Sequence, residues 1–174
     1  FSVQKMKGLL QKLSSGTSDE TPAPLPIENL LQQAVAAKLA NAPKPVLEIL
    51  DPGLVVFANW ARLERVIGHL IQNAIEATPR DGQVIVQLAR QDDSAIIEVK
   101  DSGHGMSEEF IRERLFKPFE STKSAGMGIG VFESREYIRE LGGQLEVVSS
   151  PSGGTTFHVI LPLHRQDQAV EGVA

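Results

Sequence analysis

The chain has 174 residues, 41% of them hydrophobic, which suits one globular domain with short extensions. Its net charge of -5 and the lack of a basic stripe argue against nucleic acid as the main partner, while a local cationic pocket for a nucleotide stays open. The sequence has no cysteine, which excludes disulfides and thiolate metal sites, and no apolar run approaches membrane-spanning length.

Residues 1–14 carry an apolar seam at helical spacing, formed by Val3, Met6, Leu10 and Leu13. Two interpretations stay open: a terminal helix that packs on its own domain, or the end of a coiled-coil or four-helix dimerisation element. The chain starts within this helical pattern, so we expect it to be part of a larger protein. Residues 15–26 are rich in Ser, Thr and Pro and predict a mobile linker.

A domain is predicted over residues 27–164, followed by a flexible tail at 165–174. Its first half predicts a helix at 27–41, strands at 46–50 and 54–58 joined by a turn, a helix at 60–78, and a hairpin of 83–90 and 95–101. The long helix has an apolar face made of Leu63, Val66, Ile67, Leu70, Ile71, Ala74 and Ile75.

The second half predicts a helix from Ser107, a helix from 128 or 129 to 141, and strands at 144–149 and 155–163. Strands and helices do not alternate one for one, and several strand pairs are hairpins. The predicted fold is therefore α/β of the α+β type: a two-layer sandwich whose mixed, mostly antiparallel sheet carries helices on one face.

The long helix also carries three polar residues on one stripe, His69, Asn73 and Glu76. The neighbours of Asn73 are apolar, so its amide needs a partner. It could be a satisfied core amide, or an oxygen ligand for a hard cation such as Mg²⁺, which takes few protein ligands.

Asp101 ends a strand whose other residues are mostly apolar, so its carboxylate is expected to point into a pocket. An adenine amino group would pair with it, whereas the carbonyl of guanine would be repelled; a turn-capping Asp is the alternative. Gly103 and Gly105 would let the backbone lie against a base, and the hydroxyl of Thr155 could join Asp101 there.

Between residues 116 and 130 the chain combines an apolar knob, a polar stretch and a glycine cluster. Phe116 and Phe119 could belong to the core or anchor a mobile lid. Lys123 can meet a phosphate as a point charge. Gly126, Gly128 and Gly130 lead directly into a helix, whose free N–H groups favour an anion.

The ordered set of Asn73, Asp101-x-Gly103-x-Gly105, Phe116-x-Pro118-Phe119, Gly126-x-Gly128-x-Gly130 and Gly154-Thr155-x-Phe157 resembles the N, G1, F, G2 and G3 boxes of sensor histidine kinases. These kinases belong to the GHKL ATPase superfamily, and the resemblance covers roughly residues 27–163. The helix after the G2 box is similar to that of the PrsK-type kinases of the PEP-CTERM system.

The resemblance implies the Bergerat ATP-binding fold, ATP and Mg²⁺ as ligands, and Asn73 as the magnesium ligand. It implies an ATP-binding set of Asn73, Asp101, Gly103, Gly105, Met106, Phe116, Phe119, Thr122, Lys123, Ser124, Gly126, Met127, Gly128, Ile129, Gly130 and Thr155. His69 and Glu76 are candidates for a phosphate contact or for supporting the metal ligand.

The resemblance further implies transfer of the γ-phosphoryl group to a histidine on an upstream dimerisation domain, of which residues 1–14 would be the end. A response regulator would be the next partner, the whole protein would be a homodimer, and this part would be cytoplasmic whether or not a membrane anchor is present. The four histidines of the chain, His69, His104, His158 and His164, all follow the predicted linker, so the phosphoacceptor is expected outside it.

Two other functions stay open at this point. One is an ATPase of the same superfamily that works as a conformational clamp. In its gyrase, MutL and heat-shock chaperone relatives, a glutamate that activates water stands at the place of His69, and the lack of this glutamate here argues against efficient ATP hydrolysis. A nucleotide-binding scaffold with a degenerate site is the other alternative, and the intact boxes argue against it.

Overall fold

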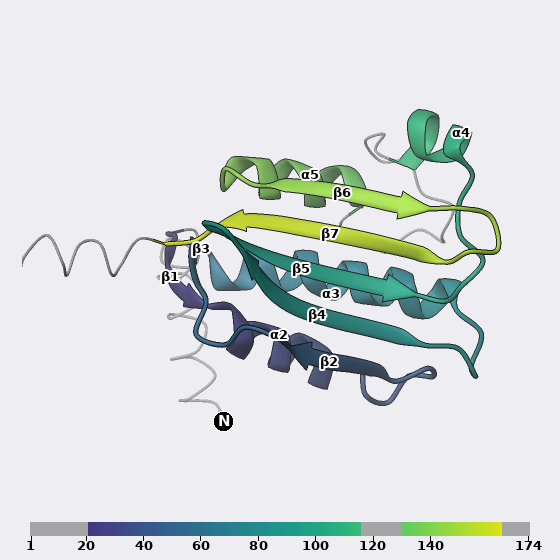
Figure 1. Cartoon of the computed structure of the whole chain (residues 1–174), viewed down its shortest axis with the longest axis horizontal. Helices are drawn as coiled ribbons and strands as arrows, with labels where there is room; N and C mark the ends of the chain where they lie inside the picture. Colours follow the sequence, from purple (N-terminus) through teal and green to yellow (C-terminus); the bar gives the residue numbers. More distant parts are fainter. Residues whose placement is uncertain (1–20, 116–129, 165–174) are drawn as a thin grey trace, which may run out of the picture.

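The computed structural model describes residues 21–115 and 130–164, which form a two-layer α/β sandwich (Figure 1). The elements in chain order are β1 (Ala23–Pro26), α2 (Ile27–Ala36), β2 (Pro45–Ile49), β3 (Val55–Ala58), α3 (Trp60–Ala77), β4 (Val84–Gln91), β5 (Ser94–Asp101), α4 (Glu108–Phe110), a π-helical turn (Ile111–Leu115), α5 (Val131–Glu140), β6 (Gln144–Ser149) and β7 (Thr155–Pro162). Within the described ranges, no helix has the length and apolar character needed to cross a membrane.

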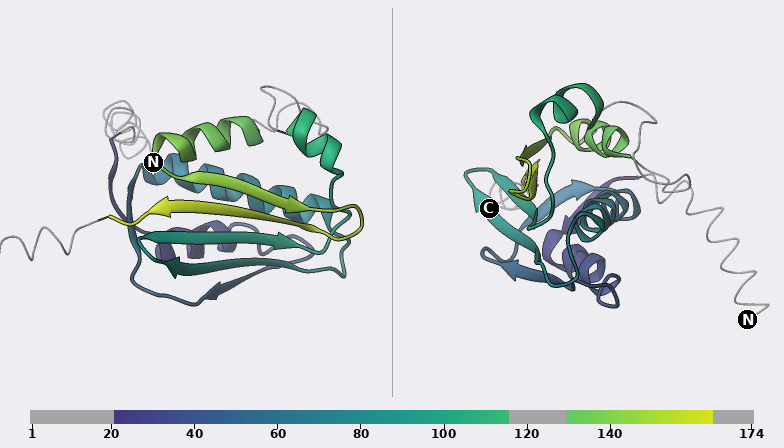
Figure 2. Two further views of the ribbon diagram at one scale, coloured as in Figure 1. Left: turned by 45° about the horizontal axis from the view of Figure 1, so that its top comes forward. Right: turned by 90° about the vertical axis from the view of Figure 1, so that its right-hand side faces the viewer.

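The main sheet has five strands in the order β2-β4-β5-β7-β6. Only the pairing of β2 with β4 is parallel, and the other three pairings are antiparallel. Helices α2, α3 and α5 cover one face of this sheet, as both views of Figure 2 show. The predicted two-layer fold with a mostly antiparallel mixed sheet and helices on one face is confirmed.

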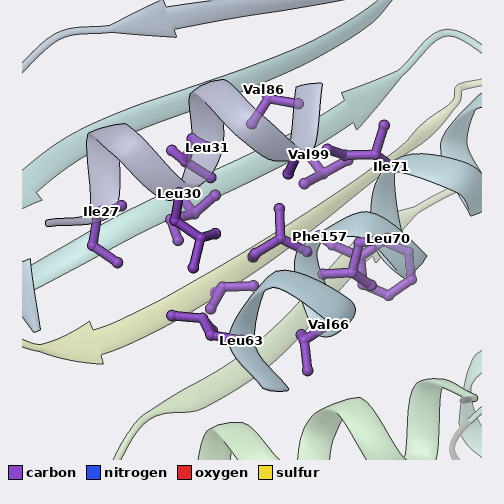
Figure 3. Close-up of a cluster of buried hydrophobic side chains, with 14 of the residues drawn as sticks. Ile27, Leu30, Leu31, Leu63, Val66, Leu70, Ile71, Val86, Val99 and Phe157 are labelled. Carbon is purple, nitrogen blue, oxygen red and sulfur yellow. The ribbon is translucent and has the colours of Figure 1, made fainter. Parts of the chain in front are cut away.

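One hydrophobic core lies between the sheet and the helices. The inward positions of β4 and β5 alternate strictly along each strand, which is the period of a half-buried strand. They meet the apolar faces of α2 and α3 in the cluster of Figure 3, which includes Leu30, Leu31, Leu63, Leu70, Ile71, Val86, Val99 and Phe157. All seven residues predicted for the buried face of α3 are buried.

Helix α3 is fixed at its N-terminus by contacts that also position α5. Asn59 is the N-cap, and its side-chain oxygen accepts a hydrogen bond from the backbone N–H of Arg62 at 3.0 Å. The backbone N–H of Asn59 donates to the Tyr137 hydroxyl of α5 at 2.9 Å. Arg62 stacks over the Tyr137 ring and pairs with Glu140 at 3.1 Å. These contacts hold α3 and α5 side by side.

The predicted linker at 15–26 is wrong at its C-terminal end, because residues 23–26 form strand β1. This strand pairs antiparallel with β3 in a separate two-stranded sheet, and Leu25 is buried. Proline lacks a backbone N–H, yet Pro24 and Pro26 are tolerated because a two-stranded sheet leaves one side of each strand unpaired. Residues 1–14 and the first part of the linker, residues 15–20, lie outside the described residues.

The strands predicted at 46–50 and 54–58 exist but do not pair with each other. β2 joins the main sheet beside β4, whereas β3 pairs with β1. The preceding helix is also shorter than predicted, since α2 ends at Ala36 and the chain continues in turns. Helix α5 starts at Val131, slightly later than predicted, with Gly130 as its N-cap.

Candidate functional site

Asp101 and Thr155 lie directly opposite each other on neighbouring strands. Asp101 is the last residue of β5, Thr155 is the first of β7, and the two are register partners. Asp101 continues the inward series of Ala95, Ile97 and Val99, so its side chain lies on the helix-covered face. Both residues are buried, at 6% and 5% exposure. The pair therefore forms a polar end to an otherwise apolar interior.

The Asp101 carboxylate is held by backbone donors. The N–H of Gly103 donates to its Oδ1 at 2.8 Å, and the backbone N–H of Thr155 is a second donor. Burial raises the pKa of the Asp101 carboxyl above its usual 3.8, while these hydrogen bonds and the nearby His104 oppose the rise. Two N–H groups do not use all the lone pairs of a carboxylate, so Asp101 can accept a further hydrogen bond from a ligand.

The glycines after Asp101 permit close contact between backbone segments. A Cβ on Gly103 would overlap the carbonyl of Ala77 at the end of α3, and a Cβ on Gly105 would overlap that of Ser150. Gly105 also has φ +73°, a conformation that favours glycine. The segment after β5 therefore packs closely between the end of α3 and the turn before β7.

The turn before β7 also contacts this segment and the end of β5. A Cβ on Gly154 would overlap the carbonyl of Asp101, and the N–H of Ser152 donates to the carbonyl of His104 at 2.7 Å. In Figure 1 the ends of α3 and β5 and the start of β7 lie together at the right-hand end of the sandwich. The structure thus brings together the glycine turns that the sequence separates by about fifty positions.

Asn73 lies one turn before the end of α3, on the flank of its apolar face. Its Nδ2 lies 3.1 Å from Nε2 of His69, one turn earlier. Its Oδ1 is buried and has no hydrogen-bond partner among residues 21–115 and 130–164. A buried amide oxygen without a protein donor fits a ligand for a hard cation. No group of three or more His, Asp or Glu that could hold a metal exists in the described part of the chain.

Gly130 forms the N-terminal end of α5, but its N–H is not open to an anion. It donates to Oε1 of Glu133 at 2.7 Å, as in one half of a capping box. The prediction that this helix start supplies free N–H groups to a phosphate therefore has to exclude the N–H of Gly130 itself.

Two of the remaining predicted residues are described by the structure, and the others lie outside the described residues. Met106 is half-buried and packs against the core, while Glu76 is exposed and accepts a hydrogen bond from Gln72 at 2.8 Å. Outside the described residues lie Phe116, Phe119, Thr122, Lys123, Ser124, Gly126, Met127, Gly128 and Ile129.

The sequence prediction missed Ser149, the last residue of β6. Its hydroxyl accepts a hydrogen bond from the N–H of Met106 at 2.8 Å and donates one to the carbonyl of Gly154 at 3.0 Å. It also lies 2.7 Å from the Thr155 hydroxyl. A serine at a strand end before Pro151 looks like an ordinary turn residue, so no signal in the sequence singles it out.

Comparison with known families gives one matching model, described as histidine kinase-, DNA gyrase B- and HSP90-like ATPase, which matches residues 58–165. These residues include α3, the segment after Asp101 and the turn before β7, which are the parts that build the site.

Similar curated proteins are named as sensor proteins or as kinases. The sensor protein FixL of Bradyrhizobium diazoefficiens is 35% identical over 78% of this chain and 28% of its own length. The C4-dicarboxylate transport sensor protein DctB of Rhizobium meliloti is 39% identical over 66% of this chain and 18% of its own length. Sporulation kinase C of Bacillus subtilis is 36% identical over 64% of this chain and 26% of its own length. The matches thus span about a fifth to a quarter of these curated relatives.

Solved structures agree on the fold. The nucleotide-free catalytic domain of histidine kinase ThkA has a TM-score of 0.69 at 25% identity, with 81% of this chain and 95% of that domain covered. The mycobacterial sensor histidine kinase MprB has a TM-score of 0.70 at 22% identity, with 83% and 99% covered. The predicted Bergerat fold agrees with this likeness to histidine kinase catalytic domains.

Gly105→Ala should lower the free energy of unfolding more than Gly53→Ala does. The difference measures how closely the backbone of Gly105 packs against the carbonyl of Ser150. Both glycines have positive φ, +73° and +79°, but nothing lies within 4 Å of a Cβ on Gly53. We expect a loss of about 1 kcal/mol for Gly53→Ala from backbone conformation and a further ~1–3 kcal/mol for Gly105→Ala from overlap. Urea unfolding measures both, and equal losses would contradict the packed arrangement.

The raised pKa of Asp101 predicts a pH dependence of stability in the ligand-free protein. The folded state holds this proton more tightly than the unfolded chain, so the contribution of Asp101 to the free energy of unfolding falls as pH rises from 3.8 through the raised pKa. Asp101→Asn cannot titrate. The stability of wild type minus that of Asp101→Asn, from urea unfolding at several pH values, should decrease over this window, and an increase would show that the pKa is lowered.

Proposed function

Since the chain belongs to the family of histidine kinase-, DNA gyrase B- and HSP90-like ATPases, we propose that it is the ATP-binding catalytic domain of a sensor histidine kinase. The observation that carries this proposal is the buried Asp101 carboxylate beside Thr155. Glycine turns surround it, and the turn at Gly103 packs directly against the end of α3. The sensor proteins and sporulation kinases among its relatives favour a kinase over the other members of the family.

Asp101 and Thr155 recognise the adenine base. The carboxylate retains lone pairs beyond those that Gly103 and Thr155 occupy, and it can accept a hydrogen bond from the exocyclic amino group. Gly103 and Gly105 carry no side chain that would keep the base away from the backbone. Binding of a base to buried, prearranged acceptors discriminates strongly against a base that lacks the donor.

Asn73 holds Mg²⁺ through its Oδ1, a buried oxygen that has no hydrogen-bond partner among the described residues. His69 holds the other end of the carboxamide, because its Nε2 lies 3.1 Å from Asn73 Nδ2. When bound, the cation neutralises charge on the phosphates of the nucleotide. Lys123 and the glycines at 126–128 remain sequence-based predictions for contacts with the same phosphates.

Phosphoryl transfer by this domain depends on positioning and charge neutralisation, because little covalent chemistry falls to the protein. The domain holds the γ-phosphoryl group toward an imidazole nitrogen of a histidine on the dimerisation domain of the same protein. A response regulator then receives the phosphoryl group. We further propose that the whole protein is a homodimer and that this domain faces the cytoplasm.

Titration with a fluorescent ATP analogue, with Mg²⁺ and with EDTA, tests the nucleotide site. Wild type should bind in both conditions and more tightly with Mg²⁺. Asp101→Asn should lose about 10- to 100-fold in affinity in both, since one hydrogen bond to a charged group is worth about 1.5–3 kcal/mol. Asn73→Ala should bind like wild type in EDTA but lose the gain from Mg²⁺.

The control for this titration is Gln72→Ala, which changes an exposed hydrogen bond to Glu76 next to Asn73 on the same helix and should leave both affinities unchanged. Equal binding by wild type and Asp101→Asn would refute the adenine site. A gain from Mg²⁺ that survives in Asn73→Ala would refute the metal ligand.

The kinase assignment makes a separate prediction about the reaction. Incubated with Mg²⁺ and γ-labelled ATP, the 174-residue chain should form no acid-labile phosphohistidine, and a longer protein with its upstream region should form it. ATP hydrolysis by the chain alone should be slow. Brisk steady-state hydrolysis would instead favour an ATPase that works as a conformational clamp, and phosphohistidine on the chain itself would contradict an upstream acceptor.

A further inference from the structure

Ser149 connects the two segments that line the predicted base site. It ends β6, and its hydroxyl lies within hydrogen-bond distance of three groups: the N–H of Met106 at 2.8 Å, the carbonyl of Gly154 at 3.0 Å and the Thr155 hydroxyl at 2.7 Å. Met106 belongs to the segment after Asp101, and Gly154 and Thr155 belong to the turn and strand opposite. One hydroxyl group thus has contacts on both sides of the site.

The three contacts can be hydrogen bonds at the same time in only one arrangement of the protons. A serine hydroxyl has one proton to donate and two lone pairs to accept with. In this arrangement the carbonyl of Gly154, which can only accept, takes the Ser149 proton. The N–H of Met106 can only donate, so it takes one lone pair. The contact at 2.7 Å is then a hydrogen bond only if the Thr155 hydroxyl donates to the second lone pair.

This arrangement determines what Thr155 can offer to a ligand. The proton of its hydroxyl is used by Ser149, so the oxygen is left with lone pairs only. Asp101, its register partner, is also an acceptor. A base at this place meets two acceptors, which suits an amino group and opposes a carbonyl oxygen.

We propose that Ser149 is a positioning residue for base selectivity: by accepting the Thr155 proton, it makes Thr155 an acceptor and so favours purines with an amino group over those with a carbonyl at the same place. The inference rests on the proposed function, because it requires a purine nucleotide beside Asp101. It goes beyond that function by assigning the selectivity to a residue that need not touch the base.

A purely structural role for Ser149 predicts a different result. If the hydroxyl only holds Met106 and Gly154 in place, its removal loosens both segments and weakens every nucleotide alike. If it directs the Thr155 proton, its removal frees that proton to donate to a carbonyl. The ratio of affinities for two nucleotides then changes, and this ratio separates the two roles.

The test measures the dissociation constants of Mg²⁺–ATP and Mg²⁺–ITP for the 174-residue chain by calorimetry. ITP has a carbonyl where ATP has the amino group and a proton on the neighbouring ring nitrogen N1, while its sugar and phosphates are the same, so each variant is compared with wild type on the same pair of nucleotides. Wild type should prefer ATP. Ser149→Ala should lower the preference about tenfold, the size of one hydrogen bond to a ligand. Ser149→Thr keeps the hydroxyl and should keep the preference.

The double variant Ser149→Ala, Thr155→Val shows whether the effect passes through Thr155. It lacks the freed hydroxyl, so the gain in ITP binding seen with Ser149→Ala should disappear. Thr155→Val alone provides a measurement that does not depend on the folding of Ser149→Ala: ATP should bind more weakly, and ITP should not. Thermal unfolding of each variant confirms that the compared proteins are folded.

The outcomes distinguish this inference from the proposed function. If wild type prefers ATP and Ser149→Ala keeps the full preference, or if Thr155→Val weakens both nucleotides equally, the role of Ser149 is overturned while the adenine site stands. If wild type binds neither nucleotide, the proposed function fails and the inference fails with it. A lower preference in Ser149→Ala that returns in Ser149→Thr supports the inference.

Discussion

The pairing of Asp101 with Thr155 across β5 and β7 is the constraint on which the rest of the site depends. A carboxylate buried in an apolar interior is unfavourable unless donors surround it, and here the donors are the N–H groups of Gly103 and Thr155. Both belong to segments that must come very close to Asp101. The absence of side chains at Gly103 and Gly154 is what makes this approach possible.

Helix α3 serves the core and the site at once. Its seven buried apolar residues pack on the sheet, which sets its rotation and places Asn73 on the flank of that face. Its N-terminus is held to α5 through Asn59 and Tyr137, and its C-terminus touches the segment after Asp101 through the carbonyl of Ala77. Packing along the whole helix therefore positions Asn73, and the contact with His69 holds its carboxamide.

The elements with strong patterns were predictable, and those decided by partners elsewhere in the chain were not. The apolar residues of α3 recur at the period of a helix, and those of β4 and β5 recur at the period of a strand. Sequence alone therefore identified these elements. Nothing between residues 46 and 58 indicates that β2 pairs with β4 and β3 with β1. Prolines at 24 and 26 argued for a linker, because proline cannot donate a hydrogen bond to a neighbouring strand. Only the folded structure shows that β1 pairs with β3 along one side, which leaves the other side free for the prolines.

The amino-acid sequence by itself determined the two-layer fold class, the candidate roles of Asp101 and Asn73, and the glycine turns, because each depends on residue type and local spacing. The tertiary structure decided which backbone segments those glycines allow to touch, that Glu133 takes the N–H of Gly130, and that Ser149 joins Met106 to Thr155. These are contacts between groups whose hydrogen bonds depend on distance and direction in space, and spacing along a chain carries no information about either.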